Sequence, residues 1–229
     1  MSTRISDPKA AMRKTPRQAR SRATVDAIVT AGARVLDTRG WSGFTTNEVA
    51  NVAGVSIGSL YQYFPNKMAL VEAIRRRHFD DVLAVLRRAH GSGRPSRRLI
   101  GALVNDMISI HQDYPALHRT LLDLPSHDKT KSEFDTFHQE YLREYEAIVV
   151  AYRGSGRGKA AKLTAQVLSS AIEGVVHNAA RRGALADAKF KRELASLVSC
   201  YLGETPQGND KSTSQRRKAM ASGASQDRI

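Results

Sequence analysis

The chain has little cysteine, few aromatic residues and no long apolar run. Cys200 is the single cysteine among 229 residues, which excludes an intramolecular disulfide framework and a cysteine-based zinc site. No run reaches the length of a membrane span, and the basic N-terminus lacks the apolar core of a signal peptide. No alternating strand pattern stands out, whereas Ala, Leu, Val and Arg are frequent. We therefore expect a cytoplasmic, all-α protein without a membrane segment, metal site or cofactor.

Residues 45–67 have the pattern of two short helices joined by a tight turn. Val49 and Ala53 share the spacing of one buried helical stripe. Thr46 is expected to cap the first helix, and Gly54 is expected to end it in the left-handed region. Such a pair of helices presents its second helix to the major groove of DNA.

The second helix of this pair carries its own signals. Ser56 is a good cap, and Leu60 and Phe64 lie one turn apart on the side expected to face the core. Gly58 costs about 1 kcal/mol against alanine inside a helix, so its presence favours the close approach of another backbone, such as a phosphodiester. Pro65 then ends the helix.

This segment resembles the helix-turn-helix of the tetracycline-repressor (TetR) family over about residues 20–75. The resemblance is carried by Thr45, Thr46, Val49, Ala50, Ala53, Gly54, Val55, Ser56, Gly58, Ser59, Leu60, Tyr61, Tyr63, Phe64, Asn66, Lys67, Ala69 and Leu70. It implies a three-helix DNA-binding domain at 21–67, followed by a larger helical ligand-binding and dimerisation domain at 68–203. Asn47 and Ser59 depart from the residues that the family often carries, so the operator sequence does not transfer.

The resemblance also implies roles for individual side chains. Asn47, Ser59 and Gln62 are expected to contact base edges. The residues expected to contact phosphates are Thr46, Tyr61, Tyr63 and Lys67. Gly58 is expected to permit close approach of the DNA backbone. The partner is a double-stranded DNA operator. No serine elbow, carboxylate pair or cofactor fingerprint supports an enzyme instead.

Positive charge is concentrated before the first helix. The chain carries 36 Lys and Arg against 22 Asp and Glu, and residues 1–22 hold seven of the basic residues with one Asp. A basic arm at 1–20 beside a DNA-reading domain is expected to contact phosphates, the alternative being a disordered extension that contacts nothing. The polar tail at 204–229 is also expected to be disordered.

Helical periodicity continues through most of the chain. The expected helices cover about 21–39, 66–90, 96–113, 115–123, 130–152, 160–182 and 188–202. Gly40 is expected to end the first of these, and Pro115 to occupy a first helical turn. Residues 91–95 are the best linker, and 154–158 form an interhelix loop rather than a phosphate loop, because no strand precedes them. Arg75, Arg76 and Arg77 are expected on a solvated face.

The last two expected helices carry more apolar surface than one subunit of this size would enclose. The resemblance implies that they pair with a second copy, forming a four-helix bundle in a homodimer. Two recognition helices about 34 Å apart would then match successive major grooves. The alternative is a core within one chain.

A pocket for an unknown small molecule is the other family expectation. Its candidate residues are Met107, His111, Tyr114, His118, Phe137, His138, Tyr141, Glu173 and His177. Glu173 and His177 share a helix face at i, i+4, and we interpret them as a hydrogen-bonded couple rather than metal ligands. The predicted function is that of a ligand-released repressor, and the alternative is a non-specific architectural DNA-binding protein.

Overall fold

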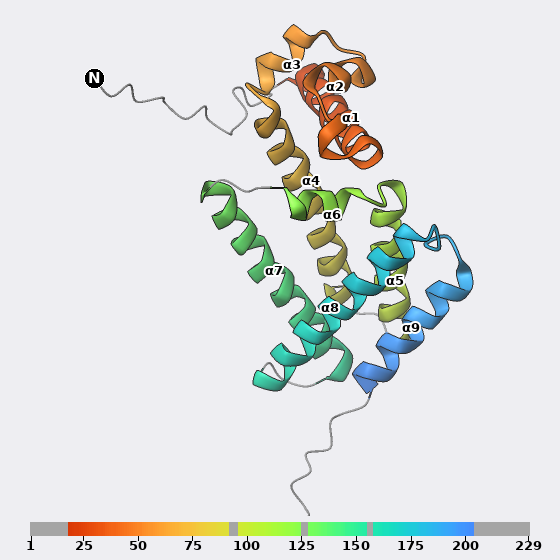
Figure 1. Cartoon of the computed structure of the whole chain (residues 1–229). Coiled ribbons are helices and arrows are strands. Elements are labelled where there is room, and N and C mark those ends of the chain that lie inside the picture. Colours follow the sequence, from red (N-terminus) through yellow and green to blue (C-terminus); the bar gives the residue numbers. More distant parts are fainter. Residues whose placement is uncertain (1–17, 92–95, 125–127, 155–157, 204–229) are drawn as a thin grey trace, which may run out of the picture.

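A computed structural model describes residues 18–91, 96–124, 128–154 and 158–203 (Figure 1). All regular structure in these ranges is helical, which confirms the predicted all-α class. The helices are α1 (Ala19–Gly43), α2 (Thr46–Ala53), α3 (Ile57–Tyr63), α4 (Lys67–Gly91), α5 (Ser96–Asp113), α6 (Leu117–Asp123), α7 (Asp128–Arg153), α8 (Lys159–Arg181) and α9 (Ala188–Gly203). None of these helices is both long and apolar enough to span a membrane. The predictions for residues 1–17, 92–95, 155–157 and 204–229 lie outside the described residues.

Side-chain caps set the ends of α2 and α3. Thr45, and not Thr46 as predicted, caps α2: its Oγ1 accepts a hydrogen bond from the Glu48 backbone N–H at 3.1 Å. Helix α2 therefore begins one residue earlier than expected. Gly54 ends α2 with φ 67°, and Ser56 caps α3 by accepting from the Ser59 N–H at 3.1 Å, both as predicted.

Gly40 has φ 61° and ψ -172°, so the regular helix is interrupted there, as predicted. A short further helical segment follows this kink and carries α1 on to Gly43. Another predicted boundary is wrong. Pro115 precedes α6 instead of lying in its first turn. The Ala116 backbone N–H donates to Asp37 Oδ1 at 2.7 Å, which ties the start of α6 to α1.

Two hydrophobic cores share helix α4. Its first half, with Leu70 and Ile74, packs with α1, α2, α3 and α6, while its second half, with Val82 and Leu86, packs among α5, α7, α8 and α9. Figure 1 shows α4 leaving the group of α1, α2 and α3 and running into the second group of helices. The two halves of the fold are therefore joined by one continuous helix.

Arg75 lies buried on α4 between these two cores, which corrects the prediction of a solvated face for all three arginines. Its guanidinium pairs with Glu72 Oε1 at 2.5 Å and donates to the Leu121 carbonyl of α6 at 3.1 Å. Arg76 and Arg77 are exposed, and Arg77 donates to Thr30 Oγ1 of α1 at 3.0 Å. The distant carbonyl on α6 explains why the sequence did not reveal the burial of Arg75.

Replacing Arg75 by methionine is expected to lower the free energy of unfolding by about 3–5 kcal/mol, because Glu72 then keeps a buried charge without its partner. Urea denaturation followed by circular dichroism measures this change. Arg88→Met on the same helix removes an exposed ion pair to Asp106 and should cost less than about 1 kcal/mol. Equal losses in the two variants would contradict the assignment.

Candidate nucleic-acid interface and buried histidine cluster

Helix α3 lies at one end of the molecule (Figure 1), and its exposed residues are Ile57, Gly58, Tyr61 and Gln62. Leu60 and Phe64 are fully buried, as predicted, and they fix the inner face of α3 against the first core. On the outer face, the Tyr61 side chain is 40% exposed and Gln62 is exposed as well. This arrangement leaves the Gln62 amide and part of the Tyr61 side chain open to solvent.

Nothing among the residues that the structure describes requires glycine at position 58. A Cβ atom added there would meet only Ser56 Oγ, at the ordinary contact distance of 3.8 Å. Its φ is not positive, so the backbone does not require glycine either. Because glycine still costs helix stability, the residue is best explained by something outside the chain that approaches this exposed position closely.

The predicted contact residues on α2 and α3 are partly organised by one another. Thr46 Oγ1 and Tyr61 Oη are 3.0 Å apart, which joins the two helices through a hydroxyl pair. Ser59 Oγ lies 2.8 Å from Ser56 Oγ at the cap of α3. Asn47 is exposed near the start of α2. The structure thus brings these polar groups to one surface, and their contacts with DNA stay a prediction.

Lys67 has a contact that the sequence did not reveal. Its Nζ donates to the Trp41 carbonyl at 3.2 Å and lies 3.5 Å from the centre of the Trp41 ring. Burial lowers the pKa of the ammonium. An ammonium has three donors, so a phosphate contact remains open to it. Tyr63 is partly buried against the first core.

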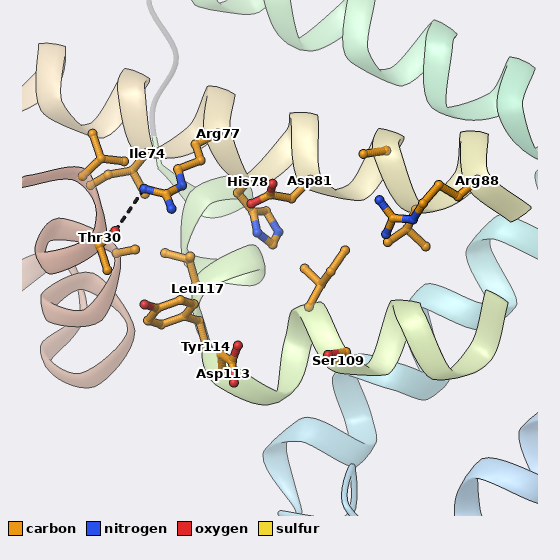
Figure 2. Close-up of a pocket in the computed structure, with 15 residues that line it drawn as sticks. Thr30, Ile74, Arg77, His78, Asp81, Arg88, Ser109, Asp113, Tyr114 and Leu117 are labelled. Atoms are coloured by element: carbon orange, nitrogen blue, oxygen red, sulfur yellow. Dashed lines mark hydrogen bonds between the residues drawn. The ribbon is translucent and has the colours of Figure 1, made fainter. Parts of the chain in front are cut away.

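An open pocket of about 410 Å³ lies between α1, α4, α5 and α6 (Figure 2). Its wall mixes charged side chains, such as Arg77 and Asp81 of α4, with apolar ones such as Leu117. Of the predicted pocket residues, Tyr114 lines this space. His78 also lines it, although it was not among the predicted residues.

Four histidine side chains meet beside this pocket: His78 from α4, His111 from α5, His118 from α6 and His177 from α8. The ring centres of His118 lie 4.9 Å from His78, 5.3 Å from His111 and 4.7 Å from His177. His78 Nε2 is 2.7 Å from His118 Nδ1, and His111 Nδ1 is 2.9 Å from the Met107 carbonyl oxygen. Three of the four were predicted pocket residues, so the structure joins them into one cluster.

Burial keeps these imidazoles neutral. It lowers the pKa of His78 to about 3, with smaller contributions from His111 and His177. It also lowers the pKa of His177 to about 4 and holds the pKa of His118 well below its ordinary value. The same burial raises the pKa of the Glu173 carboxyl.

Glu173 and His177 do not form the hydrogen-bonded couple that their spacing suggested. Glu173 Oε1 lies 3.9 Å from His118 Nε2 instead. His177 Nε2 is buried and has no hydrogen-bond partner among the residues that the structure describes. The side chains nearest to Glu173 and His177 belong to other helices, and i, i+4 spacing along α8 cannot reveal them.

The other predicted pocket residues lie apart from the open pocket. Met107 and Tyr141 are buried in the second core. Phe137 stacks on Phe79 with ring centres 3.9 Å apart, and His138 is exposed. The sequence prediction did not include His78, which lies in the buried stripe of α4, one turn after Ile74 and one turn before Val82. A histidine at a position where the pattern calls for an apolar residue was the signal that could have identified it.

Known protein families match both halves of the chain. Residues 28–74 match the family profile described as bacterial regulatory proteins, tetR family. Residues 95–202 match the profile described as tetracyclin repressor-like, C-terminal domain. The two matched segments include α2, α3 and most of the helices that form the second core.

Curated relatives match over a short segment. The chain is 38% identical over 66 residues to the HTH-type transcriptional repressor KstR2 of Rhodococcus jostii, covering 29% of this chain and 32% of that protein. It is 32% identical over 77 residues to the HTH-type transcriptional activator FasR of Mycolicibacterium smegmatis, covering 34% of this chain and 35% of that protein. The matches thus span about a third of each curated relative.

Solved structures resemble this fold over most of its length. One is the fatty acid degradation regulator FadR of Bacillus halodurans, with a TM-score of 0.64 and 16% sequence identity. The match covers 79% of this chain and 98% of that one. At this identity the similarity establishes the fold alone.

The neutral histidines predict a loss of stability in acid. The folded protein leaves His78, with its pKa of about 3, neutral where the unfolded chain binds a proton near the ordinary pKa of 6.5. The unfolded state therefore gains protons, and the free energy of unfolding is retained above pH 6.5 and falls toward pH 4. The slope from His78 alone approaches about 1.4 kcal/mol per pH unit. Protonation of Glu173, whose folded pKa is raised, opposes part of this loss.

Urea denaturation at several pH values between 7 and 4 measures the slope. His78→Gln keeps a hydrogen-bonding side chain that does not titrate in this range, and it should reduce the slope. His90→Gln alters a histidine outside the cluster that contacts Glu144, and it should leave the slope from the cluster in place. A slope that is the same in His78→Gln and the unaltered protein would refute the assignment.

Proposed function

The chain belongs to the tetR family of bacterial regulatory proteins, and we propose that it is a repressor that binds a palindromic operator as a homodimer and releases it when a small molecule binds. The family and the fold are those of transcriptional regulators and not of enzymes. Of the two curated relatives, the one with the higher identity is a repressor and the other is an activator, and the proposal takes the sign of the first.

The exposed face of α3 is the observation that carries the proposal. Gln62 and Tyr61 offer hydrogen-bonding groups there, and Gly58 leaves space that no side chain of the protein uses. In the proposed complex, Asn47, Ser59 and Gln62 bear on base edges, and Thr46, Tyr61, Tyr63 and Lys67 hold phosphates. An architectural protein that binds through its basic arm alone would not need this face.

The open pocket between α1, α4, α5 and α6 supports regulation by a small molecule. It borders α1, which packs directly on the helix-turn-helix, and α4, which joins the two cores. The hydrogen bond from Arg77 to Thr30 connects these two helices beside the pocket (Figure 2). A ligand that fits the pocket better when α4 has shifted against α1 would favour a spacing of the recognition helices that no longer matches DNA.

Selection of bound fragments from a random DNA library tests the DNA-binding part of the proposal. The expected product is one short palindrome, protected in a nuclease footprint and bound with a salt dependence that reflects phosphate contacts. Steep salt dependence without any enriched sequence would favour the architectural alternative and contradict the proposal.

Gly58→Ala gives the matched variant for the same assay. Among the described residues the added methyl group would meet only Ser56 Oγ, at 3.8 Å, so the free energy of unfolding should stay the same or rise by up to about 1 kcal/mol. Operator affinity should fall, because the methyl group occupies the space of the approaching DNA backbone. Unchanged affinity would show that the backbone does not approach Gly58.

An apolar surface on α8 and α9 supports the dimer. The exposed fractions are 63% for Leu163 and 46% for Val167 on α8, and 53% for Leu197 and 37% for Tyr201 on α9. Leu168, Leu194 and other apolar residues of the same two helices face the second core instead. Each helix thus buries one apolar face within the chain and leaves another for a second copy.

Leu163→Glu combined with Leu197→Glu should convert the dimer to a monomer, because four charges would then enter one apolar interface. Sedimentation equilibrium measures the mass. Asn105→Asp adds a charge at an exposed position on α5 and should leave the dimer intact. A dimer that survives the double substitution would place the interface elsewhere.

A further inference from the structure

We propose that His78, His111, His118 and His177 form a binding site for one divalent transition-metal ion, with Zn²⁺ as the fitting ion. This differs from the sequence-based expectation of no metal site, which did not include His78. One donor atom from each of His78, His111 and His118 lies within 4.8 Å of the other two, and all three side chains are buried. The inference does not depend on operator binding.

The spacing of the donors is close to that of a zinc site. Zinc–nitrogen bonds of about 2.0–2.1 Å in a tetrahedron place the ligating nitrogens about 3.3 Å apart. His78 Nε2 and His118 Nδ1 are now 2.7 Å apart, so a small opening of this pair would admit the ion. His111 belongs to the same group, in which one donor nitrogen of each ring lies within 4.8 Å of those of the other two. Ligation requires these donors to move from at most 4.8 Å to about 3.3 Å from one another.

His111 is already oriented for ligation. A ring nitrogen that contacts a carbonyl oxygen must donate its proton, so Nδ1–H donates to the Met107 carbonyl at 2.9 Å. The other nitrogen, Nε2, then carries a free lone pair. Metal-binding histidines are held in this way, by a backbone carbonyl or a carboxylate on the ring nitrogen that does not bind the ion.

The pair His78 and His118 needs one proton to move. One of the two facing nitrogens now carries the proton of their hydrogen bond. When both bind the ion, that proton shifts to the other nitrogen of its own ring. For His118 this nitrogen is Nε2, which lies 3.9 Å from Glu173 Oε1 and can then donate toward the carboxylate.

His177 is not among the three rings whose donor atoms lie within 4.8 Å of one another, but it borders them and is the proposed fourth ligand. Its Nε2 is buried without a hydrogen-bond partner among the described residues, an arrangement that is costly for a polar atom. The centre of its ring lies 5.2 Å from that of His111 and 4.7 Å from that of His118. A bound ion would give this nitrogen a partner.

The donor type selects the class of ion. Imidazole nitrogen suits Zn²⁺, Ni²⁺ and Cu²⁺, whereas Mg²⁺ and Ca²⁺ require mostly oxygen ligands. Burial lowers the pKa of each of the four imidazoles and so favours the neutral form that binds metal. His78 also lines the open pocket (Figure 2), so one ligand of the proposed site borders a space that is open to solvent.

Zinc titration of the full chain, purified without a histidine tag and stripped with a chelator, tests the proposal. Competition with a chromophoric chelator should show one equivalent of Zn²⁺ bound per chain. His111→Ala should weaken this binding by at least about 100-fold, since a direct ligand matters at least as much as the groups that orient it. His90→Ala changes a histidine outside the cluster and should bind like the unaltered protein.

Two measurements on the unaltered chain test the site even if a variant fails to fold. Co²⁺ in place of Zn²⁺ should give the intense visible absorption of a tetrahedral site, and Zn²⁺ added in one equivalent should remove it. X-ray absorption at the zinc edge should show imidazole nitrogens in the first shell. Absence of stoichiometric binding, or equal binding by folded His111→Ala and His90→Ala, would overturn the proposal.

Discussion

Helix α4 carries a layer of buried polar side chains between two hydrophobic cores, and the fold depends on hydrogen-bond partners for that layer. Glu72, Arg75 and His78 follow one another at intervals of three on α4, and each is buried. Arg75 satisfies Glu72 and reaches the Leu121 carbonyl, while His78 reaches His118, so both external partners lie on α6. The seven-residue helix α6 thus supplies the hydrogen-bond partners that α4 does not provide for Arg75 and His78. Without α6, the Arg75–Glu72 pair would remain, but Arg75 would lose its carbonyl acceptor and His78 its ring partner. A buried polar group without a partner costs more than the loss of apolar contact alone.

The same short helix connects the layer to the helices on either side. Its N-terminal side is bonded to Asp37 of α1 through the Ala116 N–H, and His118 approaches Glu173 of α8. A ligand in the open pocket and an ion in the histidine cluster would therefore act on the same element. The proposed release of DNA needs an element with two arrangements that both the ligand and the DNA influence. Helix α6 has the contacts for that role, because it touches α1, α4 and α8, and α8 carries part of the proposed dimer surface.

Sequence reasoning succeeded where the determinants are local and failed where they are distant. The end of α2 at Gly54, the cap at Ser56 and the buried positions of α3 depend on residues within one turn, and each was predicted. The burial of Arg75 depends on a carbonyl 46 residues away, and that of His78 on a ring 40 residues away. Neither partner is visible from spacing along one helix. The i, i+4 pair of Glu173 and His177 shows the same limit, because nearness on one helix did not decide which groups became partners.

The exposed face of α3 and the buried polar layer differ in how well they should tolerate substitution. The outer face of α3 contributes side chains that the first core does not bury, and a Cβ atom at Gly58 would meet only Ser56 Oγ, at 3.8 Å, among the described residues. Operator preference can therefore change by substitution there without loss of the first core, which is held by Leu60 and Phe64 from the inner side. The polar layer has no such freedom, since each of its groups is the partner of another. A change in the sensed molecule is consequently expected in the pocket wall, among exposed residues such as Arg88 and Ser109, and not among the buried groups on α4 and α6 that hold the two cores together.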